Sequence, residues 1–136
     1  MGGFLFLYSK YNYARFLEDM NKLTLFQRIR VVIIALFFLG TKRRDDFKCS
    51  QYVNKIYRLA RIPVWSHFKN INPDQKNNPP FGEAIFLLEK GIRSKRWSHV
   101  AIALPFGFVI HLSYYWGEKV VITNLQKIWE RYDLAT

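Results

Sequence analysis

The residues best suited to chemistry are one cysteine and two histidines that follow it along the chain. Cys49 is the single cysteine of 136 residues, which excludes a disulfide framework and a multi-cysteine zinc site. It lies where a loop is predicted to turn into a helix, and a helix N-terminus favours the thiolate. The nearby cations Lys48, Arg43 and Arg44 are expected to lower its pKa further. Taken alone, a lone cysteine is also typical of a small buried apolar side chain.

The two histidines change this balance because they are predicted to lie on neighbouring strands. His99 begins an otherwise apolar run, residues 98–104, and His111 lies in the next such run. The Pro-Phe-Gly connection at residues 105–107 predicts a three-residue hairpin, with a type I turn followed by a left-handed glycine. In that register the histidines share one face as diagonal neighbours, roughly 7–8 Å apart at the backbone. We therefore predict nucleophilic catalysis in which Cys49 attacks a carbonyl, His99 is the base and His111 fixes its tautomer.

Helices are predicted in the first half of the chain. Apolar residues recur at helical spacing over residues 11–22, 24–40 and 49–61. In the second of these helices Thr24 and Gln27 form a capping box. Its apolar stripe is broad enough that we expect it to be largely buried.

The second half of the chain has the pattern of a sheet. Beyond a polar loop, short apolar or β-branched runs bounded by Gly and Pro predict strands at residues 83–88, 98–104, 108–113 and 119–123. A short helix at residues 125–131 closes the chain. Helices followed by antiparallel strands predict an α+β fold, with N-terminal helices packed on an antiparallel sheet. We expect one domain over residues 1–136, with an N-terminal helical extension at about residues 1–23.

Charge and hydropathy limit the partners and the location. Lys and Arg number 21 against 10 Asp and Glu, a net charge of +11, so nucleic acid, an anionic membrane or an anionic polymer could each be attracted. The start of the chain has no basic segment or cleavage site typical of a signal peptide. The longest apolar run, residues 31–39, is far shorter than the roughly 20 residues of a spanning helix. These features predict a cytoplasmic protein or one delivered by a route without a signal.

Five segments, in order along the chain, resemble the NlpC/P60 family of cysteine peptidases. Residues 48–63, which begin Lys-Cys-Ser-Gln-Tyr-Val and end Ala-Arg-Ile-Pro, resemble the nucleophile helix of that family. Residues 98–102 and 109–113 are similar to its two histidine strands, residues 80–86 to its Pro-Gly-Asp-Leu-Val-Phe-Phe strand, and residues 120–132 to its closing strand and helix. The resemblance implies a papain-like fold, a Cys-His-His triad and hydrolysis of amide bonds in peptidoglycan stem peptides. The bond would be of the D-glutamyl–diamino acid type, cleaved without metal or cofactor.

The sequence departs from the family pattern beside the nucleophile. Lys48 and Gln51 stand where the family has Asp and Gly, and residues 40–46 lack the tyrosine and paired glycines of its substrate loop. The peptidoglycan specificity is therefore less well supported by the sequence than the thiol chemistry.

Two basic clusters precede the predicted catalytic residues and suggest how an anionic substrate is bound. Arg43 and Arg44 come shortly before the cysteine, and Arg93 and Arg96 come shortly before the first histidine. We predict that these four residues, together with Ser50, bind substrate groups such as stem-peptide carboxylates, wall polymers or phospholipid heads. The alternative is that both clusters are solvated loops.

Two other functions stay open at this stage. The same triad could serve an acyl hydrolase or acyltransferase acting on lipid, which would bring peripheral membrane contact. The chain could instead be a non-catalytic basic binding domain. Nucleic acid is not expected as the partner, because the basic residues follow no recognisable nucleic-acid motif. The oligomeric state is not determined by the sequence.

Overall fold

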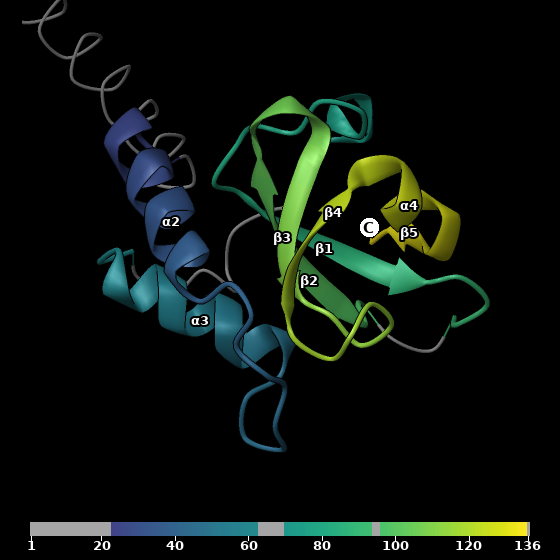
Figure 1. The fold of residues 1–136 in the computed structure, drawn as a ribbon. Helices are drawn as coiled ribbons and strands as arrows, with labels where there is room; N and C mark the ends of the chain where they lie inside the picture. The colour runs from purple at the N-terminus through teal and green to yellow at the C-terminus, as the bar shows by residue number, and fades with distance from the viewer. Residues whose placement is uncertain (1–22, 63–69, 94–95, 136) are drawn as a thin grey trace, which may run out of the picture.

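The computed structural model describes residues 23–62, 70–93 and 96–135 (Figure 1). The predicted helix at residues 11–22, and all of the predicted N-terminal extension except Leu23, lie outside these residues. Within them the chain forms, in order, α2 (Leu25–Phe37), α3 (Cys49–Leu59), β1 (Ala84–Glu89), β2 (His99–Leu104), β3 (Phe108–Leu112), β4 (Val120–Asn124), α4 (Leu125–Arg131) and β5 (Tyr132–Leu134). The predicted helices and strands of this part are confirmed, and β5 is an additional strand.

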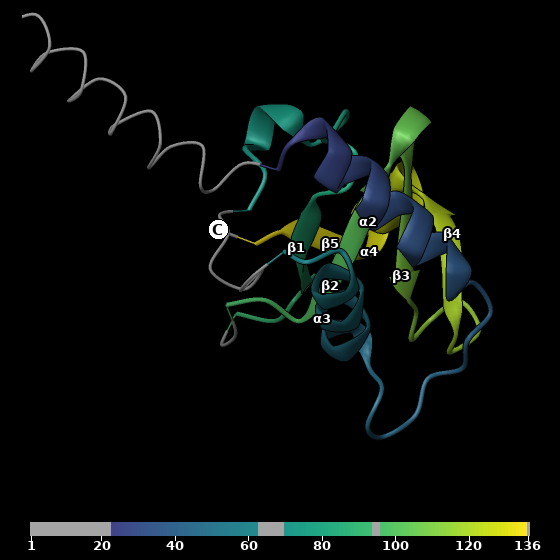
Figure 2. The same ribbon diagram turned by 90° about the vertical axis from the view of Figure 1, so that its left-hand side faces the viewer.

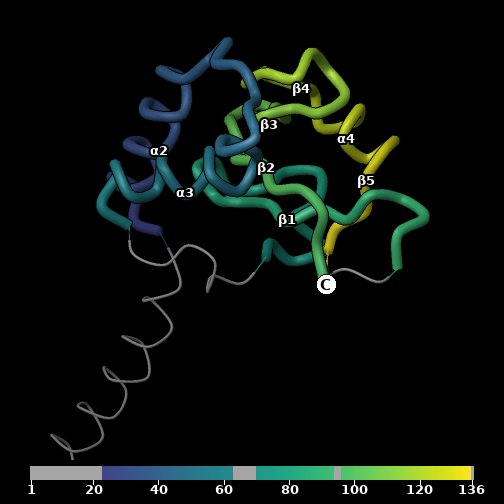
Figure 3. The backbone as a smooth tube through the Cα atoms, turned by 90° about the horizontal axis from the view of Figure 1, so that it is seen from below, coloured from purple at the N-terminus to yellow at the C-terminus, as the bar shows by residue number. Residues whose placement is uncertain are grey.

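The strands form one antiparallel sheet in the order β4-β3-β2-β1-β5. Helices α2 and α3 cover one face, and α4 packs on the other (Figure 1). Figure 2 shows α2 and α3 in front of the sheet, and Figure 3 shows the same two helices on the side away from α4. Successive side chains of β2 alternate between these two faces. Val100 and Ile102 face α2 and α3, while Ala101 and Ala103 face α4. The predicted α+β class is confirmed.

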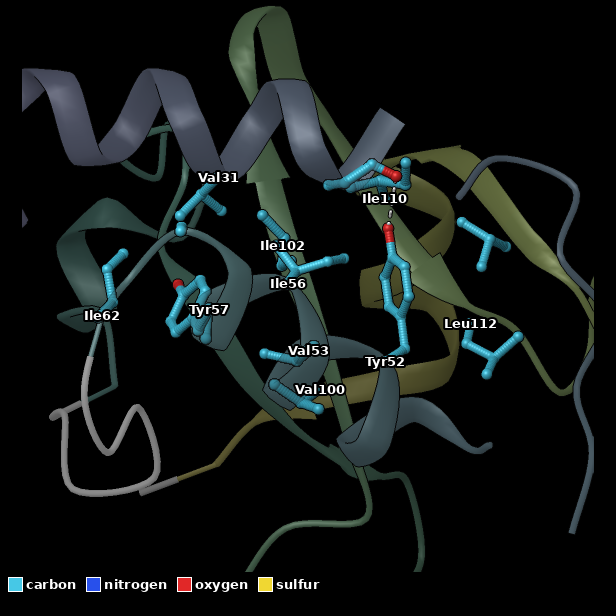
Figure 4. Close-up of a cluster of buried hydrophobic side chains, with 14 of the residues drawn as sticks. Val31, Tyr52, Val53, Ile56, Tyr57, Ile62, Val100, Ile102, Ile110 and Leu112 are labelled. Carbon is cyan, nitrogen blue, oxygen red and sulfur yellow. Dashed lines mark hydrogen bonds between the residues drawn. The ribbon is translucent and has the colours of Figure 1, made fainter. Parts of the chain in front are cut away.

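Helix α3 is anchored in the core by two tyrosines (Figure 4). The side chains of Tyr52, Val53, Ile56 and Tyr57 are buried against the sheet. The Tyr52 hydroxyl donates to the carbonyl of Ala35 at 3.0 Å, and the Tyr57 hydroxyl donates to the carbonyl of Gly82 at 2.7 Å. These bonds satisfy both buried hydroxyls and join α3 to α2 and to the segment that enters β1. The first residue of α3 is thereby held in a defined place beside the sheet.

Helix α2 has the predicted start but not the predicted burial. The Thr24 hydroxyl accepts from the Gln27 N–H at 3.2 Å, and the Gln27 side chain accepts from the Thr24 N–H at 2.8 Å, which confirms the capping box. The expectation that its apolar stripe is largely buried is wrong, because only Val31 and Ala35 are buried. The sheet and α3 contact one side of this helix, and its apolar residues continue around the other side. Among the described helices, none is both long and apolar enough to span a membrane.

The β2–β3 connection has the predicted length and register. Leu104 pairs with Phe108, as expected for a three-residue loop. The predicted type I turn is wrong, because Phe106 has a φ of 66° and joins Gly107, at 80°, in the left-handed region. A type I turn would have kept the residue before the glycine right-handed. The pairing register is nevertheless the predicted one. The side chains of β2 and β3 that share a face of the sheet are therefore those that were predicted to do so.

Candidate active site

Cys49 is the first residue of α3, as predicted, and it is half-buried. The helix begins with the N–H of Tyr52 donating to the carbonyl of Lys48 at 2.9 Å. The Gln51 side chain accepts from the Lys48 N–H at 3.0 Å and from the Ser50 hydroxyl at 3.3 Å. Gln51, which stands where the family pattern has glycine, therefore acts as a local cap for the turn that carries the thiol.

The Cys49 thiol lies against the beginning of β2. The backbone N–H of Val100 donates to it, and Val100 directly follows His99. The β2–β3 ladder runs from Leu104 only as far as Ile102, so the two strands are separating at this point. The N–H that the thiol uses is thus at the place where β2 no longer pairs with β3. Helix α3 and strand β2 together bring the cysteine next to the first histidine position.

Burial dominates the ionisation of this thiol. Desolvation raises the pKa of Cys49 above its usual range, while the Val100 N–H, the N–H groups of Ser50 and Cys49 and the Arg43 guanidinium act in the opposite direction. The expected net stabilisation of the thiolate is therefore wrong in sign. The helix start and Arg43 do stabilise the thiolate. Their effect is smaller than the loss of hydration that the thiolate suffers because protein surrounds the sulfur. The thiol is neutral at neutral pH.

The two histidines are joined in a buried hydrogen-bonded chain. Nε2 of His99 lies 2.7 Å from Nδ1 of His111, and Nε2 of His111 lies 2.8 Å from Oγ1 of Thr123. All three side chains are buried. Thr123 is a diagonal neighbour of His111 across the β3–β4 ladder, because His111 pairs with Val121. The hairpin register thus leads to direct contact between the two imidazole rings, as predicted from the shared face.

Burial keeps both imidazoles neutral. Desolvation, helped by repulsion from the nearby Arg43 guanidinium, lowers the pKa of His99 to about 4. Desolvation and repulsion from His99 lower the pKa of His111 well below its usual range. One orientation of the chain leaves Nδ1 of His99 unprotonated, with its Nε2–H donating to His111 and the Nε2–H of His111 donating to Thr123. In that orientation His99 is a proton acceptor.

Two aromatic rings surround the histidine pair. Tyr132, on β5, stacks on His99 with a centroid distance of 5.2 Å and an interplanar angle of 19°. Trp116 meets His111 edge-on at 5.6 Å. Desolvation by burial raises the pKa of Tyr132, and a smaller contribution from the charge of Cys49 indicates that the phenol and the thiol are near each other. The phenol ring therefore links the thiol and the imidazole and restricts the orientation of the His99 ring.

The predicted substrate-binding residues fall into two groups. Arg43 acts electrostatically on both Cys49 and His99, and its guanidinium lies 4.9 Å from the centre of the Tyr114 ring. Ser50 is adjacent to the nucleophile. Arg44 is exposed, 3.7 Å from a carboxylate oxygen of Asp46.

Arg93 and Arg96 lie in the exposed β1–β2 connection, which Figure 1 shows extending away from α3. None of the described contacts connects these two arginines with the thiol or the histidines. Of the four arginines, only Arg43 is thus brought to the site by described interactions. A binding role for the other three stays a prediction.

Three residues of the site were not predicted from the sequence. Thr123, Trp116 and Tyr132 contact the histidines, and each comes from a segment at the end of the chain. The β3–β4 register could have indicated Thr123, because it is the polar residue diagonal to His111 on the same face. Tyr132 had no such signal, since β5 was not recognised as a strand. Within the described parts of the chain, no three His, Cys, Asp or Glu side chains converge to form a metal site.

Replacing Thr123 with Val is expected to lower the free energy of unfolding by about 1–3 kcal/mol. Valine has nearly the same shape, but it leaves Nε2 of the buried His111 without its partner. Denaturant unfolding at neutral pH measures the change. Thr123→Ser retains the hydroxyl and should lose less than the valine variant. A valine variant as stable as the wild type would contradict a role for this hydrogen bond.

Comparison of the sequence with models of protein families and with curated proteins found no match. Among solved structures the chain is similar to the crystal structure of the NlpC/p60 domain of the peptidoglycan hydrolase SagA, with 22% sequence identity and a TM-score of 0.47. The likeness covers 80% of this chain and 98% of the other. The fold and site observed in this protein define an α+β domain in which a cysteine begins a helix beside a buried histidine pair.

Proposed function

We propose that this protein is a thiol hydrolase that cleaves amide bonds in peptidoglycan stem peptides. One observation carries the proposal: the 2.7 Å contact between His99 and His111, placed where the Cys49 thiol meets the backbone of the residue after His99. A nucleophile, a neutral base and a group that orients the base are the parts that acyl transfer requires. The five sequence segments that resemble NlpC/P60 peptidases support the same class of reaction.

The first half of the reaction uses the neutral thiol and imidazole. The sulfur of Cys49 forms a bond to the substrate carbonyl carbon as its proton moves to Nδ1 of His99. The negative charge that develops on the carbonyl oxygen is stabilised by the backbone N–H of Cys49 at the start of α3. The C–N bond then breaks, and His99 returns the proton to the leaving amine. An acyl thioester on Cys49 remains.

The second half restores the enzyme. The oxygen of a water molecule attacks the thioester carbonyl as His99 takes a proton from that water. The C–S bond then breaks. The proton passes to the sulfur, which releases a carboxylic acid and the free thiol. Throughout, His111 accepts from Nε2–H of His99 and holds the tautomer in which Nδ1 can act as the base. Thr123 holds His111 in turn, so both are positioning residues.

The charge beside the thiol favours an anionic substrate. Arg43 is the cation that acts on both Cys49 and His99, and its stacking on Tyr114 restrains the guanidinium. A guanidinium binds a carboxylate through two parallel hydrogen bonds. Stem peptides carry free carboxylates close to their amide bonds. We therefore assign Arg43 to substrate binding, and the carboxylate beside the scissile amide is the group it fits.

Purified sacculi and phospholipid vesicles test this assignment side by side. We expect the wild-type protein to release soluble muropeptides from sacculi, and Cys49→Ala to release none while unfolding at the same temperature as the wild type. Cys49→Ser is the matched control of size, since it keeps a much weaker nucleophile in place. Fatty-acid release from vesicles without muropeptide release would instead identify a lipid acyl hydrolase. Nucleic-acid binding with a steep salt dependence and no hydrolysis would indicate a binding domain.

A further inference from the structure

The surface of α2 that faces away from the sheet is apolar along its whole length. We call it the outer face of α2, and it comprises Leu25, Phe26, Ile29, Ile33, Leu36 and Phe37, all exposed. Side chains three, four and seven apart lie on the same side of a helix, so these residues form one stripe. The stripe lies opposite the buried side chains of Val31 and Ala35. Exposed apolar stripes of this size usually mark an interaction site.

The stripe is most exposed near its two ends. Phe26 and Phe37 are 79% and 83% exposed, and Ile33 lies between them in the same line. Figure 2 shows α2 beside α3, with both helices in front of the sheet. No partner within the described fold covers these side chains. Any partner that covers them would therefore come from outside the described fold.

Helices α2 and α3 and the loop between them carry mostly positive charge, although Arg28 of α2 is paired with the carboxylate of Glu83 at 2.8 Å. Neither α2 nor α3 contains Asp or Glu, and residues 24–61 carry nine Lys and Arg against Asp45 and Asp46 alone. Arg30 is exposed on α2 itself. The ammonium of Lys55, on α3, lies 5.8 Å from the centre of the Phe38 ring, which places a cation beside the C-terminal end of α2. The partner is expected to be apolar and anionic together.

We propose that the outer face of α2 binds the surface of an anionic phospholipid bilayer. A helix with aromatic and aliphatic residues on one side and cations at its borders lies in the plane of the interface, with its apolar side at the boundary of headgroups and acyl chains. The cations gain from the negative surface potential of such a bilayer. Helix α2 has 13 residues, about 20 Å in length, so it suits an interfacial position. The proposal does not rest on the proposed hydrolysis, because none of the six residues belongs to the active site.

Vesicle co-sedimentation of the full chain tests the proposal. The probe is a phosphatidylcholine vesicle with about 30% phosphatidylglycerol at about 0.1 M salt, compared with pure phosphatidylcholine. We expect the wild type to bind the anionic vesicles more strongly. Phe26→Gln, Ile33→Gln and Phe37→Gln, combined in one variant, remove three of the six apolar side chains of the stripe without changing the net charge. We expect this variant to partition onto the vesicles about tenfold or more weakly, because three of the six apolar side chains that would leave water are replaced by polar ones.

Phe106→Asn provides the matched control. Phe106 is 96% exposed on the β2–β3 connection and has a left-handed φ that asparagine tolerates, so its loss removes an exposed aromatic ring elsewhere. Binding by this control should equal that of the wild type, and both variants should retain the circular dichroism spectrum and the unfolding temperature of the wild type. Failure of the wild type to bind anionic vesicles, or equal binding by the triple variant, would overturn the proposal. The proposal would also be overturned if light scattering showed a dimeric wild type and a monomeric triple variant. A second copy of the chain would then be the partner that covers the outer face of α2.

Discussion

Replacing His99 with Gln is expected to lower the rate of amide hydrolysis by about 10²–10⁴-fold, the usual contribution of a general base. Glutamine can still hydrogen-bond to His111, but it cannot accept the proton of the Cys49 thiol. The effect should be large because burial raises the pKa of this thiol, so the base is needed to remove its proton. Muropeptide release under single-turnover conditions measures the rate.

Alkylation gives a second measure of the same step. Cys49 is the single cysteine of the chain, so iodoacetamide incorporation reports on it alone. His99→Gln should slow alkylation at pH 7.5. His111→Gln should have a smaller effect on both rates, because His111 contacts the base and not the reacting atoms. An effect of His111→Gln equal to or larger than that of His99→Gln would show that the two roles are assigned wrongly.

The free energy of unfolding is expected to fall by about 3 kcal/mol from His99 alone as the pH drops from 6.5 to 4, at 1.36 kcal/mol for each unit of pKa difference. The pKa of His99 is about 4 in the folded protein, below its ordinary value near 6.5. Between these values the unfolded chain binds a proton that the folded protein excludes, so acid favours unfolding. The contribution is fully present above pH 6.5 and is lost as the pH falls. His111, whose pKa is also lowered, acts in the same direction.

Urea unfolding between pH 7 and 4.5 measures most of this loss before most carboxylates titrate. In His99→Gln the slope of stability against pH should be clearly smaller, although the variant is less stable at pH 7. A wild-type stability that stays constant down to pH 4.5 would contradict the neutral, buried histidine pair. An unchanged slope in His99→Gln would assign the effect to other groups.

Local features of the sequence were sufficient for much of the fold and for the histidine pair. The capping box of Thr24 and Gln27 depends on residues three apart, so it can be predicted from neighbouring residues. The length of the three-residue connection determines the pairing register of β2 and β3, and so which of their side chains share a face of the sheet. That register placed His99 and His111 on one face, and the structure brings their rings into contact. The exact turn conformation at Phe106 was not needed for this result.

Tertiary structure decided what depends on contacts between distant segments. The sign of the Cys49 pKa shift follows from how much protein surrounds the sulfur, which a helix start and neighbouring cations do not reveal. Thr123 and Tyr132 reach the histidines through pairings of β4 and β5 that only the assembled sheet defines. The same holds for α2, whose apolar sequence predicted burial. The helix packs one side against α3 and the sheet, and only the arrangement of these elements determines that the other side is exposed. Burial is a property of the whole assembly, and periodicity indicates which residues share a side without indicating what covers it.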